Sequence, residues 1–458
     1  MTLNSIVFIF IFLPIVFFLY HLLPKKAKNL FLFLASLFFY AWNEPIYVIG
    51  LFLLIYLNYF FAQRMQKGRS YRKSSFYQIL TINLFILLYF KYYGFFLENL
   101  FHFVPIKASY TLFGVPLGIS FVIFQVISYQ IDVYTSKSKA CQNFISFGLY
   151  VSFFPKLLMG PITRYEDMQE NLENRKVTFA SLEQGIVFFI TGLAQKVILA
   201  DTFALLCTSL SQPTSVLAAW LGILAFTFQI YFDFNGYSKM AIGIGTFFGF
   251  HLPENFNYPY IATSIKDFWS RWHMTLSKWF RDYIYIPLGG NRTTKRKWIR
   301  NILVVWLTTG LWHGASFTYI LWGLYFGILL ILEKRFPFPK GHSVLQRIFT
   351  FILVMIGWVF FSHDTIASSF TYLGKMFGMG VSSLMDTQFL WYFQNYGIYI
   401  LCGFIGMTPL MKQLGMAFQV ERPHLYKLMT TCLYMVLFVI SIAYLLGAGY
   451  EAFMYAQF

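Results

Sequence analysis

The fold class of this chain is decided by the stretch Leu303-Val-Val-Trp-Leu-Thr-Thr-Gly-Leu-Trp-His313-Gly-Ala-Ser-Phe-Thr-Tyr-Ile-Leu-Trp-Gly323. This stretch lies inside an apolar run, 298–332, with basic clusters on both sides. Because clustered Lys and Arg are typical of cytoplasmic loops, both ends of the run are expected on one side of a membrane. The run then forms a helical hairpin or a re-entrant pair, with His313 near its turn. At about 1.5 Å per residue, His313 lies about 20 Å along from Trp298, deep in a hydrocarbon core of about 30 Å.

The composition of the 458 residues also indicates a membrane protein. The chain is 58% hydrophobic and only 12% charged, whereas a soluble domain is about 25% charged. This excludes a soluble enzyme, a disordered chain and a disulfide scaffold. The net charge of +17 arises from basic residues in short loops between apolar runs, so it follows the positive-inside rule and does not indicate nucleic acid. The four cysteines are far apart and form no Cys-x-x-Cys motif, which disfavours a metal or disulfide framework.

Apolar segments along the whole chain predict an all-α polytopic membrane protein with ten to twelve spans. The first run, 6–23, lacks a basic leader and a cleavage site, so we expect it to remain as a membrane element. Two interruptions predict broken or re-entrant helices, one at Trp42-Asn-Glu-Pro45 and one at Asp233-Phe-Asn-Gly236. The basic loop 64–73 is placed in the cytoplasm. We expect residues 1–458 to form one integral membrane domain.

Most of the eight histidines are expected to be interfacial polar residues. They lie at the ends of apolar runs or open a polar loop: His21, His102, His251, His342, His363 and His424. His273 differs, because Trp269, Trp272, Leu276 and Phe280 share its helical spacing and predict an aromatic face with one imidazole. The alternative for His273 is an interfacial amphipathic helix with a satisfied histidine.

His313 is an ionisable group in the middle of an apolar run, and such groups are functional hypotheses by default. Gly310, Gly314 and Ala315 surround it, so another backbone or a ligand could approach closely. Imidazole can take a proton from a hydroxyl near neutral pH; the alternative is a histidine hydrogen-bonded between helices. No metal site is expected, because neither His273 nor His313 has an acid or Cys at ligand spacing. Nucleotide-binding loops and a serine-hydrolase elbow are absent from the sequence.

Five motifs together resemble the membrane-bound O-acyltransferase (MBOAT) superfamily, in its branch that acetylates bacterial polysaccharides such as alginate and peptidoglycan. The motifs are Ala35-Ser-Leu-Phe-Phe-Tyr-Ala-Trp42, Phe153-Phe-Pro-Lys-Leu-Leu-Met-Gly-Pro161, Asp233-Phe-Asn-Gly-Tyr-Ser238 with Pro253-Glu-Asn-Phe-Asn257, Ile286-Pro-Leu-Gly-Gly-Asn-Arg292 and Leu311-Trp-His-Gly-Ala-Ser316. The resemblance implies a helical bundle around a central funnel, with re-entrant and interfacial helices and a catalytic core of roughly 110–335.

The resemblance also implies site residues. His313 matches the principal catalytic histidine of the family, and His273 matches the second active-site histidine. The end of the chain, Phe453-Met-Tyr-Ala-Gln-Phe458, resembles an F-x-Y-x-x-F acyl-relay peptide in which Tyr455 carries the acyl group briefly. The alternative for Tyr455 is an aromatic anchor at the membrane interface.

The function implied is a membrane O-acetyltransferase of the bacterial plasma membrane. Acetyl-CoA would be the cytoplasmic acyl donor, with no resident cofactor. The acetyl group would pass to an extracytoplasmic SGNH-type acetyltransferase partner, which places it on a cell-surface polysaccharide: an alginate-like polymer, peptidoglycan or cellulose. Two alternatives stay open: D-alanyl transfer to teichoic acid, and a transporter or flippase with a midplane site. The transporter predicts inverted repeats, which the sequence does not display.

Overall fold

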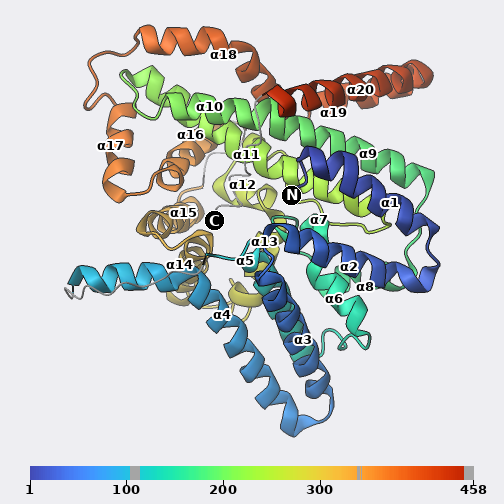
Figure 1. Cartoon of the computed structure of the whole chain (residues 1–458). Coiled ribbons are helices and arrows are strands. Elements are labelled where there is room, and N and C mark those ends of the chain that lie inside the picture. The colour runs from blue at the N-terminus through green and yellow to red at the C-terminus, as the bar shows by residue number, and fades with distance from the viewer. Residues whose placement is uncertain (104–113, 338–340, 342, 448–458) are drawn as a thin grey trace. The chain divides into compact units, whose positions relative to one another are not determined.

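The computed structural model describes residues 1–103, 114–337, 341 and 343–447 (Figure 1). Helices dominate this part of the chain, and its one β-type pairing is an isolated bridge between Ser215 and Ser383. The chain divides into two compact units. The first contains Met1–Phe189 and Tyr237–Pro253, and the second contains Ile190–Gly236 and Glu254–Phe458. The predicted all-α membrane class is confirmed.

The first unit is built mainly from the N-terminal helices. They are η1 (Phe8–Phe12), α1 (Leu13–Leu22), α2 (Lys25–Asn43), α3 (Tyr47–Gln66), α4 (Arg69–Phe103), α5 (Ile119–Tyr134), α6 (Phe144–Ser152), α7 (Phe154–Leu157), α8 (Tyr165–Asn174) and the start of α9 (Phe179–Ala194). The chain breaks between α2 and α3, as Pro45 predicts. Three buried amides, Asn58, Asn83 and Gln130, bond one another at 2.9–3.0 Å and join α3, α4 and α5. Such amide pairs hold helices together where hydrocarbon gives no hydrophobic drive.

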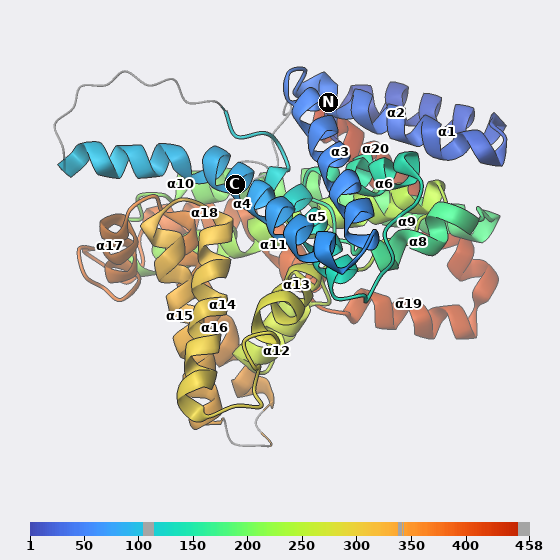
Figure 2. The same ribbon diagram turned by 90° about the horizontal axis from the view of Figure 1, so that it is seen from below.

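The second unit contains the remaining helices. They are η2 (Gln195–Ala200), α10 (Asp201–Ser209), the first part of α11 (Val216–Phe247), η3 (Pro259–Ile261), α12 (Ile265–Arg271), α13 (Met274–Phe280), η4 (Arg281–Tyr285), α14 (Lys295–His313), α15 (Phe317–Arg335), α16 (Ser343–Ser362), α17 (Ile366–Met376), α18 (Thr387–Gly406), α19 (Leu410–Glu421) and α20 (Pro423–Gly447). Helices α14, α15 and α16 lie side by side (Figure 2).

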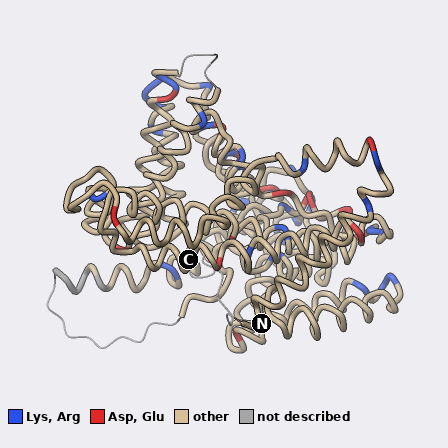
Figure 3. Tube along the Cα trace, turned by 90° about the horizontal axis from the view of Figure 1, so that it is seen from above, with Lys and Arg blue, Asp and Glu red and all other residues tan. Residues whose placement is uncertain are grey.

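The predicted hairpin over 298–332 is confirmed. It consists of α14 and α15, which meet at a short turn after His313. A Cβ added to Gly310 would lie 2.3 Å from the Tyr319 carbonyl oxygen, and one added to Gly323 would lie 2.3 Å from that of Trp306. Glycine at these two positions therefore allows the two backbones to touch. Lys and Arg gather at the open end of the hairpin, where α14 begins at Lys295 and α15 ends at Arg335 (Figure 3), as expected for a run that enters and leaves on one side.

Seven helices in the described residues are long and apolar enough to cross a membrane. They are Tyr47–Gln66, Arg69–Leu97, Phe179–Ser209, Val216–Phe247, Phe317–Arg335, Ser343–Ser362 and Pro423–Gly447. An eighth is possible in α18 and α19, which bend by 66° at their junction. This number is below the ten to twelve expected. The runs 216–232 and 238–250 merge into one helix, and the apolar helix Ile119–Tyr134 is shorter than the 18 residues required. The first run forms a helix too short to pass the same test.

The break expected at Asp233, Asn235 and Gly236 does not occur, since α11 is continuous from Val216 to Phe247. The Lys196 Nζ atom lies 2.9 Å from Asp233 Oδ1 and 2.6 Å from Asp201 Oδ1, with Lys196 and Asp233 both buried. A buried carboxylate that contacts an ammonium group does not require the helix to unwind toward water. A Cβ on Gly236 would lie 2.8 Å from the Gly192 carbonyl oxygen, so the glycine allows close packing.

Candidate active site

His273 interrupts the helix that its spacing predicts. Its backbone is left-handed, with φ 43° and ψ 54°, so the chain forms two short helices, α12 and α13, with His273 at the N-cap of the second. The expectation of one continuous aromatic helix is therefore wrong. Positive φ is uncommon for residues with a Cβ, and such strain is found preferentially at functional sites.

The Asn255 residue holds this irregular backbone in place. Its carbonyl oxygen accepts a bond of 2.9 Å from the Met274 N–H, and its side-chain Oδ1 accepts one of 3.2 Å from the Thr275 N–H. The same Oδ1 atom lies 3.0 Å from His273 Nδ1. Because a backbone N–H can only donate, the Asn255 atom is an oxygen, and His273 must donate from Nδ1. In the neutral imidazole, Nε2 then carries the lone pair.

The surroundings of His273 keep its imidazole neutral. The side chain is buried, and its ring packs edge-on against Phe234 at 4.7 Å and against Trp312 at 5.9 Å between centroids. Burial lowers the pKa of His273 to about 3; this residue lies outside the helices long enough to cross the membrane. His273 is therefore a hydrogen-bond acceptor at Nε2 that does not readily take up a proton.

The electrostatic surroundings of His313 differ from those of His273, because His313 is the last residue of α14. The C-terminal end of a helix carries partial negative charge, which stabilises a nearby imidazolium. The ring is buried between Trp322 and Phe361, at centroid distances of 5.0 and 5.1 Å and nearly perpendicular to both. Perpendicular aromatic contacts fix the plane of the ring. His313 is therefore the histidine better placed to become transiently protonated.

Both histidines line one cavity of about 290 Å³, here called the histidine cavity. Most of its wall is aromatic or apolar, including Trp269, Trp272, Phe280 and Trp306. The structure thus brings His273 and His313 together, although 40 residues of sequence separate them. Within the described part of the chain, no group of three or more His, Cys, Asp or Glu side chains is arranged to hold a metal ion. Tyr455 lies outside the described residues.

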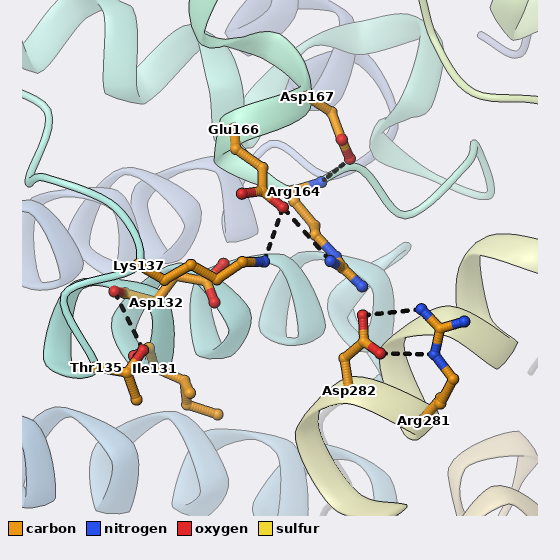
Figure 4. Close-up of polar contacts among 9 residues, drawn as sticks. All are labelled: Ile131, Asp132, Thr135, Lys137, Arg164, Glu166, Asp167, Arg281 and Asp282. Atoms are coloured by element: carbon orange, nitrogen blue, oxygen red, sulfur yellow. Dashed lines mark hydrogen bonds and ion pairs between the residues drawn. The ribbon is translucent and has the colours of Figure 1, made fainter. Parts of the chain in front are cut away.

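Cationic side chains stand at the edge of the histidine cavity. Lys266 and Arg281 both line it, and both are exposed. Arg281 makes a two-pronged ion pair with Asp282, at 2.7 Å from Nε and 3.3 Å from Nη2 (Figure 4). Planar pairing of this kind holds the guanidinium in one orientation. The cavity therefore combines a neutral interior with a positive rim.

Two features of the site were not predicted as functional. Asn255 belongs to a motif used only for the family resemblance, and its role depends on a fold that brings it beside Thr275. Trp269 lines the same cavity, and its buried indole N–H has no hydrogen-bond acceptor among the described residues. Nothing in the sequence alone singles out Asn255, because it lies among other polar residues, Glu254 and Asn257.

The fold and the cavity define a multi-pass membrane protein in which two buried imidazoles line one aromatic chamber. The model of the membrane-bound O-acyltransferase family matches residues 36–363, so the chain belongs to the MBOAT family. It is accordingly an acyltransferase of the bacterial inner membrane, and it uses an acyl donor.

Two curated relatives match most of the chain. A probable alginate O-acetylase AlgI of Azotobacter vinelandii is 41% identical over 84% of this chain and 80% of the relative. A peptidoglycan O-acetyltransferase of Helicobacter pylori is 37% identical over 83% of this chain and 80% of the relative. A teichoic acid D-alanyltransferase of Bacillus subtilis is more distant, at 30% identity over 54% of this chain and 68% of the relative. The O-acetyltransferase prediction is therefore favoured over D-alanyl transfer.

Proposed function

We propose that this chain takes acetyl groups from cytoplasmic acetyl-CoA and passes them across the membrane for O-acetylation of a cell-surface polysaccharide. The observation that carries the proposal is the histidine cavity, where two imidazoles with different electrostatic settings line one aromatic chamber. Names of relatives with 37–41% identity favour acetyl over other acyl groups. Residues 1–458 act as one acyltransferase domain, with the core of the catalysis in roughly 110–335.

His313 serves as the general base in this proposal. It removes the proton from an acceptor hydroxyl, and the hydroxyl oxygen attacks the thioester carbonyl of acetyl-CoA. The carbon–sulfur bond then breaks, the CoA thiolate leaves, and the proton on His313 passes to that thiolate. The helix end at His313 stabilises the imidazolium that exists between these steps.

His273 orients the substrates and takes up no proton during the reaction. Asn255 holds the proton of the ring on Nδ1, so the Nε2 lone pair accepts a hydrogen bond from a substrate N–H or O–H group other than the reacting hydroxyl, whose single proton goes to His313. The developing oxyanion needs a donor, which neutral His273 does not offer at Nε2. We assign that donation to Trp269, a residue of the cavity wall whose buried indole N–H has no acceptor among the described residues.

The positive rim at Lys266 and Arg281 favours the phosphates of acetyl-CoA. The cavity of about 290 Å³ has room for the acetyl group and the thioester end of the donor. In the proposal, Tyr455 receives the acetyl group as a relay, and an extracytoplasmic SGNH-type acetyltransferase then transfers it to the polymer.

The test is to supply the purified chain and its extracytoplasmic partner with acetyl-CoA labelled in the acetyl group. The proposal predicts label in ester linkage on alginate or peptidoglycan fragments, with stoichiometric release of CoA. A matched reaction with labelled D-alanyl carrier protein and teichoic acid serves as the control. Transfer of D-alanine without transfer of acetyl would contradict the proposal, while acetyl transfer alone supports it.

A further inference from the structure

The first unit contains a second cavity, of about 650 Å³, between the start of α2 and the segment that follows α8. We call it the basic pocket. Its cationic lining is Lys25, Lys26, Lys28, Arg175 and Lys176, and its acidic residue is Glu173. Five cations against one carboxylate leave a large local excess of positive charge. The pocket belongs to neither the histidine cavity nor its rim, since the two linings share no residue.

Two of these cations are held close together despite their repulsion. The Lys28 Nζ lies 4.5 Å from the centre of the Tyr20 ring, and the Arg175 guanidinium lies 5.5 Å from the same centre. The pKa of Lys28 is lowered, first by burial and then by the Arg175 charge. Like charges assembled in this way are costly unless an anion compensates them.

Arg175 is fixed by the surrounding residues. Its Nε donates to the Tyr20 hydroxyl at 2.8 Å, and its Nη1 donates to Asn29 Oδ1 at 2.5 Å and to the Asn171 carbonyl at 3.2 Å. The Tyr20 hydroxyl in turn donates to the Phe248 carbonyl at 2.9 Å. The Arg175 Nη2 atom is buried and has no acceptor within the described residues. A buried guanidinium nitrogen without an acceptor is a site for an anionic oxygen.

The backbone contributes to the same pocket. Helix α2, with 19 residues, begins at Lys25 after Pro24, and no side chain caps its first turn. The N-H groups of an uncapped first turn and the positive end of the helix dipole both favour an anion. A phosphate group suits the excess of cations, the Arg175 Nη2 atom and the N-terminus of α2, since it carries negative charge and several acceptor oxygens.

The surface next to the basic pocket is apolar. Helix α1 contributes Tyr20 and His21 to the pocket, and beside them it exposes Phe18 at 65% and Leu22 at 82%. A soluble anion would leave these apolar side chains exposed, whereas the acyl chains of a lipid would cover them. We propose that the basic pocket binds a phosphate ester, and that its source is the headgroup of an anionic membrane lipid.

The experiment measures thermal stabilisation of the purified full chain in a neutral detergent. Dioctanoyl phosphatidylglycerol is the anionic lipid, dioctanoyl phosphatidylcholine is the zwitterionic control, and CoA is the soluble phosphate ester. The variant Lys26→Gln/Lys176→Gln removes two exposed cations of the pocket, so it is expected to fold normally. Its matched control, Lys67→Gln/Lys73→Gln, removes two exposed cations from the junction of α3 and α4 in the same unit.

Phosphatidylglycerol is expected to raise the melting temperature of the wild type and of the control variant equally. Its apparent Kd should be about tenfold weaker in the pocket variant, and Arg175→Gln should weaken it further. Equal stabilisation by phosphatidylcholine, or equal loss in both double variants, would overturn the proposal. Stabilisation by CoA that the pocket variant loses, without any by phosphatidylglycerol, would support a phosphate site and overturn the lipid as its source.

Discussion

The histidine cavity and the basic pocket handle charge in opposite ways. In the histidine cavity, aromatic rings surround two imidazoles, and the cations stand only at the edge. In the basic pocket, five cations line the space and a buried arginine nitrogen is left for an acceptor. A neutral, aromatic interior suits a reaction in which charge develops and then disappears. A cationic pocket suits binding of an anion that is not changed.

The comparison shows how each site tolerates its buried polar groups. At the histidine cavity, Asn255 accepts hydrogen bonds from His273 and Thr275, while the Trp269 indole N–H has no acceptor among the described residues. Elsewhere in the second unit, Lys196 contacts two carboxylates. In the basic pocket the five cations outnumber the one carboxylate. Binding of an anion there is therefore expected to stabilise the folded chain.

Lys196→Met is expected to have the largest effect on stability. It removes the ammonium that contacts two carboxylates, and breaking a buried ion pair costs about 3–5 kcal/mol. We expect the variant to be nearly absent from membranes in a quantitative blot. Lys196→Met/Asp233→Leu should recover much of the lost protein, because an apolar pair can replace a buried ion pair. Normal levels of the single variant would show that this ion cluster does not stabilise the second unit.

Asn255→Ala is expected to lower kcat for acetyl transfer about 100-fold, because His273 loses the acceptor that sets its orientation. KM for the acyl donor should change little, since Asn255 is not part of the cavity rim. Asn255→Asp keeps an acceptor oxygen and should recover part of the rate. Asn257→Ala, at an exposed neighbouring position, is the control. Equal losses at 255 and 257 would contradict the positioning role of Asn255.

His273 is expected to make stability depend on pH. Burial lowers its pKa from 6.5 to about 3 in the folded chain. Between these values the unfolded chain binds a proton that the folded chain does not, so the free energy of unfolding rises with pH. In His273→Gln, the melting temperature should increase less steeply from about pH 4 to pH 6.5 than in the wild type. His424→Gln, at an exposed position, should keep the wild-type slope. A slope unchanged in His273→Gln would show that this imidazole titrates normally.

Arg281→Gln is expected to have the smallest effect. The residue stands at the rim and is exposed, so its loss should raise KM for acetyl-CoA about twofold to fivefold without lowering kcat. The effect should diminish in high salt, because exposed charges are screened. Lys278→Gln removes an exposed cation from the same region that does not line the cavity. If both variants raise KM equally, the rim has no special role in donor binding.

The sequence predicts the helical membrane class and the hairpin well, because both depend on local composition. The apolar run 298–332, its basic flanks and its glycines define α14 and α15 directly. The number of spans is less predictable, since Asp233 interrupts the hydrophobic pattern but not the helix. Its partner, Lys196, lies in another helix, and local pattern does not reveal that pairing.

Local composition also predicts part of the candidate active site. His313 stands out as an ionisable residue in an apolar run, and His273 as one imidazole among aromatics. Their shared cavity, the break at His273 and the role of Asn255 depend on contacts between distant segments. The aromatic spacing favoured one helix there, but Asn255 stabilises a left-handed residue in its middle. The proposed roles of His273, His313 and Tyr455 stay predictions.

The most direct test of the account is a single-turnover measurement of acetyl transfer by His313→Ala. General base catalysis contributes about 10²–10⁴-fold, so the rate should fall by at least about 100-fold. His363→Ala is the matched control, because this histidine directly follows α16 in the second unit and does not line the cavity. The account predicts wild-type transfer in His363→Ala and equal membrane levels of both variants. Transfer at the wild-type rate in His313→Ala would contradict it.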